Sequence, residues 1–222
     1  MIEDSRQIPL VIYGASGHAK VVLDAALRLE AFEVLGIVDD DPTRHGQTLF
    51  GVPILGDHTR LESRPFSHCG IVVAVGRNDA RMEIVRRLNA RGCKFAAVVH
   101  PSAQIGVGTS FGKGTVIMAG AVVNSDTTIG DHSIINTGAT VDHDCIIGDY
   151  GHIAPGAHLA GGVSVGELVH IGIGASIIQG VSIGKGSIIA AGASVVDNVP
   201  GGVVVGGVPA RKIRRLSADD VR

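Results

Sequence analysis

The chain has 222 residues, of which 45% are hydrophobic and 18% are charged, so its composition supports a sizeable core and excludes a disordered chain. Its net charge is -2 without a basic stripe, which argues against a nucleic acid or a membrane surface as partner. The three cysteines follow no paired or metal-type spacing, and we see neither a signal peptide nor an apolar stretch of spanning length. These features predict a cytoplasmic location.

The first part of the chain alternates apolar runs with amphipathic segments. Strands are predicted over residues 8–13, 34–38 and 71–75, and helices over residues 19–30 and 80–91. Strand, glycine turn and helix in succession predict a small parallel α/β domain, which we place over residues 1–98.

Three loops follow the carboxyl ends of the predicted strands, where ligands of parallel α/β sheets bind. Backbone N–H groups at a helix start suit a phosphate, and carboxylates suit the hydroxyls of a ribose or the edge of a base. The candidate nucleotide-binding residues are Gly14, Ser16, Gly17, His18, Asp39, Asp40, Gly76 and Asn78. Because the Gly-x-x-Gly-His spacing differs from the G-x-G-x-x-G fingerprint, a nicotinamide cofactor is not predicted. A plain turn without ligand is the alternative interpretation.

From Val99 to Pro200, seventeen six-residue units follow one another without an insertion. Each unit opens on an aliphatic residue, except for Phe111, and carries a small residue or valine in its fifth place. Such a period predicts one side of a triangular parallel β-helix with three units per coil. We expect this β-helix over residues 99–205 and a tail over residues 206–222. The coil length is supported by glycines that recur every eighteen residues, at Gly112, Gly130, Gly148, Gly166 and Gly184.

One corner of the predicted prism combines a histidine with a carboxylate. Strand alternation places the first and fifth residues of a unit inside and the third and fourth at the corners, where His143 and Asp144 fall. One coil later, Gly161 and Gly162 leave a notch above the imidazole. A histidine beside an acid suits general-base catalysis, although a solvated corner pair is the alternative. Cys145 occupies an inward fifth place, which predicts a filler of the interior rather than a nucleophile.

The hexads, which close on residues 207–211, resemble those of the hexapeptide-repeat acyltransferases. With the segments 14–20 and 141–145, the whole chain is similar to the sugar O- and N-acetyltransferases of the sialic acid O-acetyltransferase type. It most resembles nucleotide-4-amino-sugar N-acetyltransferases such as those that act on GDP-perosamine. The resemblance implies a Rossmann-like α/β domain, a left-handed β-helix and a homotrimer.

The resemblance also implies roles for individual residues. His143 would be the general base, and Asp144 would raise its basicity. The acetyl-CoA would contact His152, Gly161, Gly162, Ile173 and Ala191, between neighbouring subunits and without a metal. The three loops would hold a nucleotide-linked 4-amino-4,6-dideoxyhexose, either GDP-perosamine or a UDP-linked sugar. The 4-amino group of this sugar would be acetylated by direct transfer. The product would serve the biosynthesis of a surface glycan, the lipopolysaccharide O-antigen.

Three alternatives remain open at this point. O-acetylation of sialic acid or another free sugar would need no nucleotide site. A γ-type zinc carbonic anhydrase would need two histidines five residues apart, whereas the nearest pairs, 152/158 and 143/152, have other spacings. A purely structural scaffold would keep the prism and lack any activity.

Overall fold

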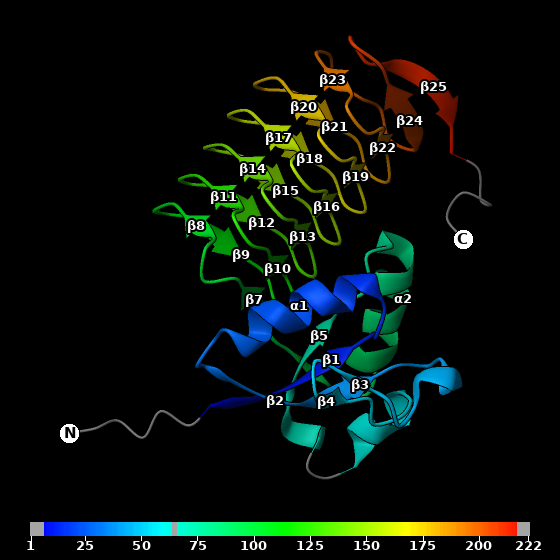
Figure 1. The fold of residues 1–222 in the computed structure, drawn as a ribbon. Helices are drawn as coiled ribbons and strands as arrows, with labels where there is room; N and C mark the ends of the chain where they lie inside the picture. The colour runs from blue at the N-terminus through cyan, green and yellow to red at the C-terminus, as the bar shows by residue number, and fades with distance from the viewer. Residues whose placement is uncertain (1–6, 64–65, 217–222) are drawn as a thin grey trace.

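The computed structural model describes residues 7–63 and 66–216 and has two parts, an N-terminal α/β part and a long prism of β-coils (Figure 1). The predicted fold class is confirmed: a parallel N-terminal sheet precedes a left-handed β-helix of six-residue units. The predicted domain boundaries stay predictions, and their outer ends, residues 1–6 and 217–222, lie outside the described residues.

The α/β part is built on a four-stranded parallel sheet with the order β2-β1-β5-β6. Helices α1 (Gly17–Leu27) and α2 (Asn78–Asn89) pack on opposite faces of this sheet, because their apolar stripes join two different clusters of strand residues. Both helices begin two residues earlier than predicted, directly after the loops that precede them. The strands are β1 (Ile8–Tyr13), β2 (Phe32–Val38), β5 (Gly70–Val73) and β6 (Lys94–Phe95).

Short elements connect β2 to β5. Strands β3 (Thr48–Leu49) and β4 (Val52–Pro53) form a hairpin, and three 3-10 turns flank it. These turns are η1 (Pro42–Arg44), η2 (His58–Glu62) and η3 (Phe66–His68). The first of them returns the chain toward the loop after β1.

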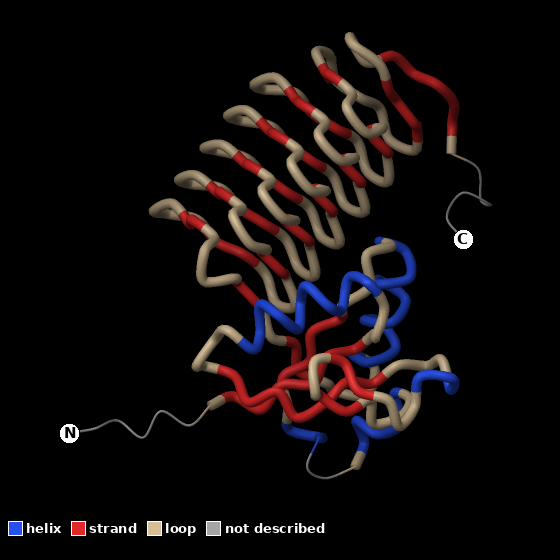
Figure 2. The backbone as a smooth tube through the Cα atoms, viewed as in Figure 1, coloured by secondary structure: helices blue, strands red, loops and turns tan. Residues whose placement is uncertain are grey.

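The β-helix has three faces made of short strands in register, which Figure 2 shows as a regular stack. Face 1 contains β7 (Val98–Val99), β10 (Val116–Ile117), β13 (Ile134–Ile135), β16 (His152–Ile153), β19 (His170–Ile171), β22 (Ile188–Ile189), β24 (Val203–Gly206) and β25 (Arg211–Arg215). Face 2 contains β8 (Gln104–Ile105), β11 (Val122–Val123), β14 (Thr140–Val141), β17 (His158–Leu159), β20 (Ser176–Ile177) and β23 (Ser194–Val195). Face 3 contains β9 (Ser110–Phe111), β12 (Thr128–Ile129), β15 (Ile146–Ile147), β18 (Ser164–Val165) and β21 (Ser182–Ile183).

The eighteen-residue coil is confirmed by the strand register, in which Ile117 pairs with Ile135 and Ile135 with Ile153. The fourth place of each unit from Gly108 to Gly192 has a left-handed φ, which turns the chain at every corner. Most of these corners are glycine because no Cβ then opposes that conformation. The exceptions among them are Asp126, His132, Asp144, Tyr150 and Leu168.

The prism interior is a stack of the predicted inward residues, and Cys145 is fully buried within it. At the first coil, however, the openers Ile105 and Phe111 remain 38% and 40% exposed, since no earlier coil covers faces 2 and 3. At the other end, the antiparallel pair of β24 and β25 closes face 1.

The α/β part packs against the outer side of face 1. Helix α1 covers the outward residues Val98, Val116 and Ile134, which join the core beneath that helix. At the adjacent corner, the His132 ring contacts Phe95 at a centroid distance of 4.6 Å and stacks on Tyr150 at 5.4 Å. His132, at a corner, and His152, on an outer face of the prism, are therefore both buried, because the α/β part covers them.

Candidate active site

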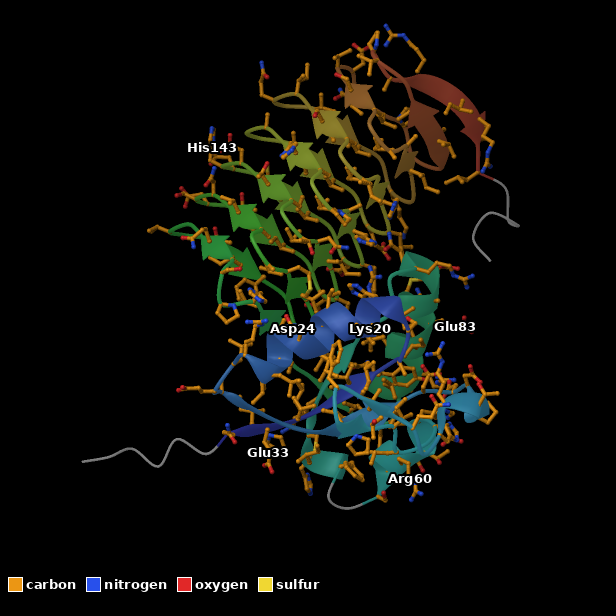
Figure 3. The ribbon with its side chains drawn as sticks, in the orientation of Figure 1. Lys20, Asp24, Glu33, Arg60, Glu83 and His143 are labelled. Atoms are coloured by element: carbon orange, nitrogen blue, oxygen red, sulfur yellow. The ribbon has the colours of Figure 1, made fainter. Side chains whose placement is uncertain are left out.

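His143 lies at the corner between faces 2 and 3, directly after β14 (Figure 3). Its Nδ1 atom is 2.7 Å from Oδ2 of Asp144, and the two side chains are 61% and 67% exposed. The neighbouring Asp142 accepts a hydrogen bond from the His143 backbone N–H and another from the Asn124 amide. The two residues expected to act as a pair are thus in contact and open to a ligand.

Gly161, one coil after His143, makes room for the imidazole ring. A Cβ atom added at Gly161 would lie 2.6 Å from Cε1 and 2.7 Å from Nε2 of His143. The predicted notch is therefore filled by the imidazole ring itself, and glycine is needed at Gly161 to admit it.

The carboxylates beside His143 favour its charged form. The hydrogen bond to Asp144 raises the pKa of His143, and the charge of Asp142 adds to this effect. When Nδ1 donates its proton to Asp144, Nε2 keeps an unshared electron pair at the exposed edge of the corner. This arrangement can accept a proton from a bound nucleophile.

We expect Asp144→Asn to move the acidic limb of the pH profile of kcat/KM to lower pH. A general base is active when neutral, so activity falls as pH drops through the raised pKa of His143, and removal of the carboxylate lowers that pKa. The plateau should also fall, because the asparagine amide no longer fixes one tautomer. NMR titration of the His143 ring in parent and variant checks the shift independently, and an unchanged midpoint would contradict it.

Gly161→Ala should displace the imidazole and lower kcat by about 10²-fold, since a misplacement near 1 Å has an effect of that size. The backbone at Gly161 does not have a left-handed φ, so alanine adds no strain to the main chain there. In a His143→Ala background the same change should have no further effect on kcat. A further loss of kcat by about 10²-fold in that background would show that Gly161 does not act through His143.

The predicted nucleotide loops meet at one edge of the α/β sheet. Asp39 accepts hydrogen bonds from the N–H groups of Ala15 and Asp41, at 2.6 and 2.8 Å, and so ties the second loop to the first. The start of α1 lacks a capping side chain at Ser16, and the first N–H groups of a helix have no acceptor within it. These groups remain suited to an anion.

Asp40 is held by its own neighbours rather than left free. Its carboxylate accepts hydrogen bonds from the Tyr13 hydroxyl at 2.6 Å, from Arg87 at 2.7 Å and from His58 at 2.9 Å. Burial alone would raise the pKa of Asp40, but these donors hold it well below its usual range. Direct contact between Asp40 and a ligand stays a prediction, while its role in shaping the loops is visible here.

Arg44 is a further candidate site residue that the sequence did not single out. Its Nη1 donates to the carbonyl of Ala15 at 2.6 Å, and its Nε contacts Asp41 at 3.3 Å. The guanidinium, 39% exposed, therefore lies beside the glycine loop. The signal that could have found it is Asp41-Pro42, an N-cap followed by proline, which predicts a short turn that returns Arg44 to this loop.

A cavity of about 460 Å³ lies between the loop after β5 and face 1. His152 forms part of its wall and is only 8% exposed. Both nitrogens of His152 have partners inside the protein: Nδ1 is 3.2 Å from the carbonyl of Gly76 and Nε2 is 3.0 Å from the Asn136 amide. Burial, together with nearby His170 and Arg81, lowers the pKa of His152 to about 3. The cavity is lined by Gly76, Arg77, Asn78, Asp79, His152, Leu168, His170, Gly186, Ile188 and Leu216.

The remaining predicted cofactor residues lie at other edges of the prism. Ile173 and Ala191 are exposed and one coil apart at the corner between faces 1 and 2, whereas Gly161 and Gly162 accompany His143 between faces 2 and 3. Asn78 contacts the prism itself, because its amide donates to the carbonyls of Leu168 and Val169. One chain therefore does not bring all the predicted contacts together.

Within residues 7–63 and 66–216, we find no cluster of three or more His, Cys, Asp or Glu side chains arranged to hold a metal. In the same part of the chain, none of the helices combines the length and apolar character that crossing a membrane requires.

Comparisons with known proteins match both parts of the chain. Residues 9–88 match the PglD N-terminal domain, and residues 108–143 and 126–161 match the bacterial transferase hexapeptide (six repeats). UDP-N-acetylbacillosamine N-acetyltransferase from Bacillus subtilis (strain 168) is 37% identical over 113 residues. That alignment spans 50% of this chain and about half the length of the relative, 51%.

Two solved structures match almost the whole chain. The perosamine N-acetyltransferase from Caulobacter crescentus, solved as a histidine-substituted mutant with CoA and GDP-perosamine, is 42% identical, with a TM-score of 0.86 over 92% of this chain and 96% of that one. The acetyltransferase domain of PglB from Neisseria gonorrhoeae FA1090, in complex with acetyl coenzyme A, is 38% identical, with a TM-score of 0.87 over 94% and 100% of the two chains. With its hexad prism, its PglD-type domain and these matches along nearly its full length, the chain belongs to the family of hexapeptide-repeat sugar N-acetyltransferases.

Proposed function

We propose that this protein transfers the acetyl group of acetyl-CoA to the 4-amino group of a nucleotide-linked 4-amino-4,6-dideoxyhexose. The observation that carries this proposal is the contact between His143 and Asp144, which presents Nε2 of His143 as an exposed base. Support comes from the relatives, among them the perosamine N-acetyltransferase bound to CoA and GDP-perosamine. Acetyl-CoA and nucleotide sugars are cytoplasmic compounds, so we place the reaction in the cytoplasm.

The transfer is direct. The amine nitrogen attacks the thioester carbonyl, a C–N bond forms and the C–S bond breaks. Nε2 of His143 accepts the proton that the amine loses and returns a proton to the departing thiolate of CoA. Asp144 stabilises the imidazolium formed in between. An acyl-enzyme intermediate is not needed, which agrees with the burial of Cys145 inside the prism.

The complete site is shared between subunits in this proposal. Within one chain, His143 lies between faces 2 and 3, while the α/β part packs against the first three coils of face 1 and against the His132 corner between faces 3 and 1. The nucleotide held by one chain would therefore meet His143 of another. The aliphatic side chain of Ile178, 39% exposed near the His143 corner, is suited to burial in a homotrimer.

The α/β part would bind the nucleotide diphosphate. The open start of α1 provides N–H donors and a positive dipole end, and Arg44 adds a guanidinium beside them. Acetylation of a free sugar on oxygen, the second candidate, makes no use of this arrangement.

The test is thiol release from acetyl-CoA with UDP-, GDP- and dTDP-linked 4-amino-dideoxy sugars and with free sialic acid. Turnover of one nucleotide sugar that is lost in folded His143→Ala would support the proposal and identify the nucleotide base of the substrate. Turnover of sialic acid alone would replace it with O-acetylation. Failure to bind acetyl-CoA would refute both.

A further inference from the structure

Arg81 of α2 carries a buried charge at the junction of the two parts of the chain. Its side chain is 1% exposed, and burial lowers its pKa to about 9. All of its side-chain hydrogen bonds go to neutral oxygens: the carbonyls of Val75, Gly76, His132, Tyr150 and Gly151 and the amide oxygen of Asn78. All five N–H groups of the guanidinium are thereby used.

These partners belong to the two different parts of the chain. Val75, Gly76 and Asn78 form the loop between β5 and α2, whereas His132 and Tyr150 are successive corners of the prism, one coil apart. Arg81 reaches His132 and Tyr150 at 2.8 Å each, and Asn78 reaches the next corner at Leu168. The loop is therefore attached to three consecutive coils through one guanidinium and one amide.

The Gly76 carbonyl is where this attachment meets the cavity. It accepts hydrogen bonds from Arg81 Nη1 at 3.1 Å and from His152 Nδ1 at 3.2 Å. Two donors from different elements fix the orientation of the peptide between Gly76 and Arg77. Because the N–H of a planar trans peptide points opposite to its carbonyl, the N–H of Arg77 is directed away from Arg81.

Burial, with a smaller contribution from the charge of Arg81, favours the neutral form of the surrounding imidazoles. Burial lowers the pKa of His18 and of His132 to about 4 and that of His152 to about 3, and Arg81 contributes to each shift. A neutral His152 with its proton on Nδ1 can donate to Gly76 while Nε2 accepts from Asn136, an assignment that fits the two observed contacts.

We propose that Arg81 is a positioning residue for the acetyl transfer, which sets the substrate-binding loop Val75–Asn78 and His152 at a fixed place on the prism. This inference rests on the proposed function, in which the α/β part presents the amino sugar to His143 of a neighbouring subunit. The guanidinium fixes the distance between the bound nucleotide and the prism. Lysine would not replace it, since a single ammonium with three donors does not span oxygens on both sides of the junction.

The experiment compares Arg81→Lys and Arg81→Met with Arg86→Lys, a control at an exposed arginine of the same helix. Circular dichroism establishes folding, and calorimetry with GDP and UDP establishes nucleotide binding. In both Arg81 variants we expect kcat to fall about 10²-fold, with the dissociation constant of the nucleotide changed less than about twofold. Arg86→Lys should match the parent. A folded Arg81→Lys with the parent's kcat, or failure of both Arg81 variants to fold, would overturn the positioning role.

A second measurement separates this proposal from the proposed function. Histidine NMR should show His152 in the parent as one neutral tautomer with the proton on Nδ1. In Arg81→Met the ring should lose that single tautomer, and its pKa should rise, because one of the charges that lower it is removed. If the parent turns over none of the nucleotide sugars, the proposed function is wrong. If the His152 spectrum is unchanged in Arg81→Met, Arg81 does not position His152 and the further inference is wrong.

Discussion

His143→Ala is expected to lower kcat by about 10²–10⁴-fold while the protein keeps its fold and its affinity for acetyl-CoA. The side chain is 61% exposed and contributes no inward packing, so its truncation removes a base without creating a cavity. Gly161 on the next coil, above the ring, remains compatible with alanine at His143, since a shorter side chain makes no new contact there.

His158→Ala provides the matched control for that prediction. His158 is also an exposed histidine of the prism, and its Nδ1 lies 2.9 Å from the hydroxyl of Thr140 on the strand below. We expect parental kcat in this variant, measured by thiol release with the nucleotide sugar that the parent prefers. Equal losses in both variants, or a His143→Ala protein with the parent's activity, would remove His143 from the chemistry.

Ile147→Ala is expected to lower the free energy of unfolding by about 2–5 kcal/mol. Ile147 is 1% exposed and lies inside the prism, where each coil packs only against its two neighbours. The missing methyl groups leave a cavity that the rigid coils do not close. Urea unfolding followed by circular dichroism measures the change.

Ile146 gives this prediction an adjacent control. It is the preceding residue of the same strand, β15, and points outward with 58% of its surface exposed. Ile146→Ala should cost at least about 2 kcal/mol less than Ile147→Ala, because little additional apolar surface is lost from the interior. Similar losses at the two positions would show that the inward and outward assignment of the hexad is wrong.

The hexad made the prism predictable because its spacing is local. An inward aliphatic residue every six positions and a glycine every eighteen specify strand, corner and coil without reference to any distant segment. The same regularity placed Cys145 inside and His143 and Asp144 at a corner, where the structure has them in contact. Three of the four strands of the first sheet were likewise predictable from apolar runs, whereas α1 and α2 begin two residues before their predicted starts.

Only the tertiary structure decided which of the residues outside the prism interior are exposed to solvent. His132 and His152 have the same places in their units as exposed residues elsewhere, and only the packing of the α/β part on face 1 buries them. Arg81 belongs to a helical segment whose pattern gives no sign of a buried charge, because its partners are carbonyl oxygens some 50 to 70 residues away in the chain. Backbone acceptors have no sequence signature, so such a junction is visible only once the chain has folded.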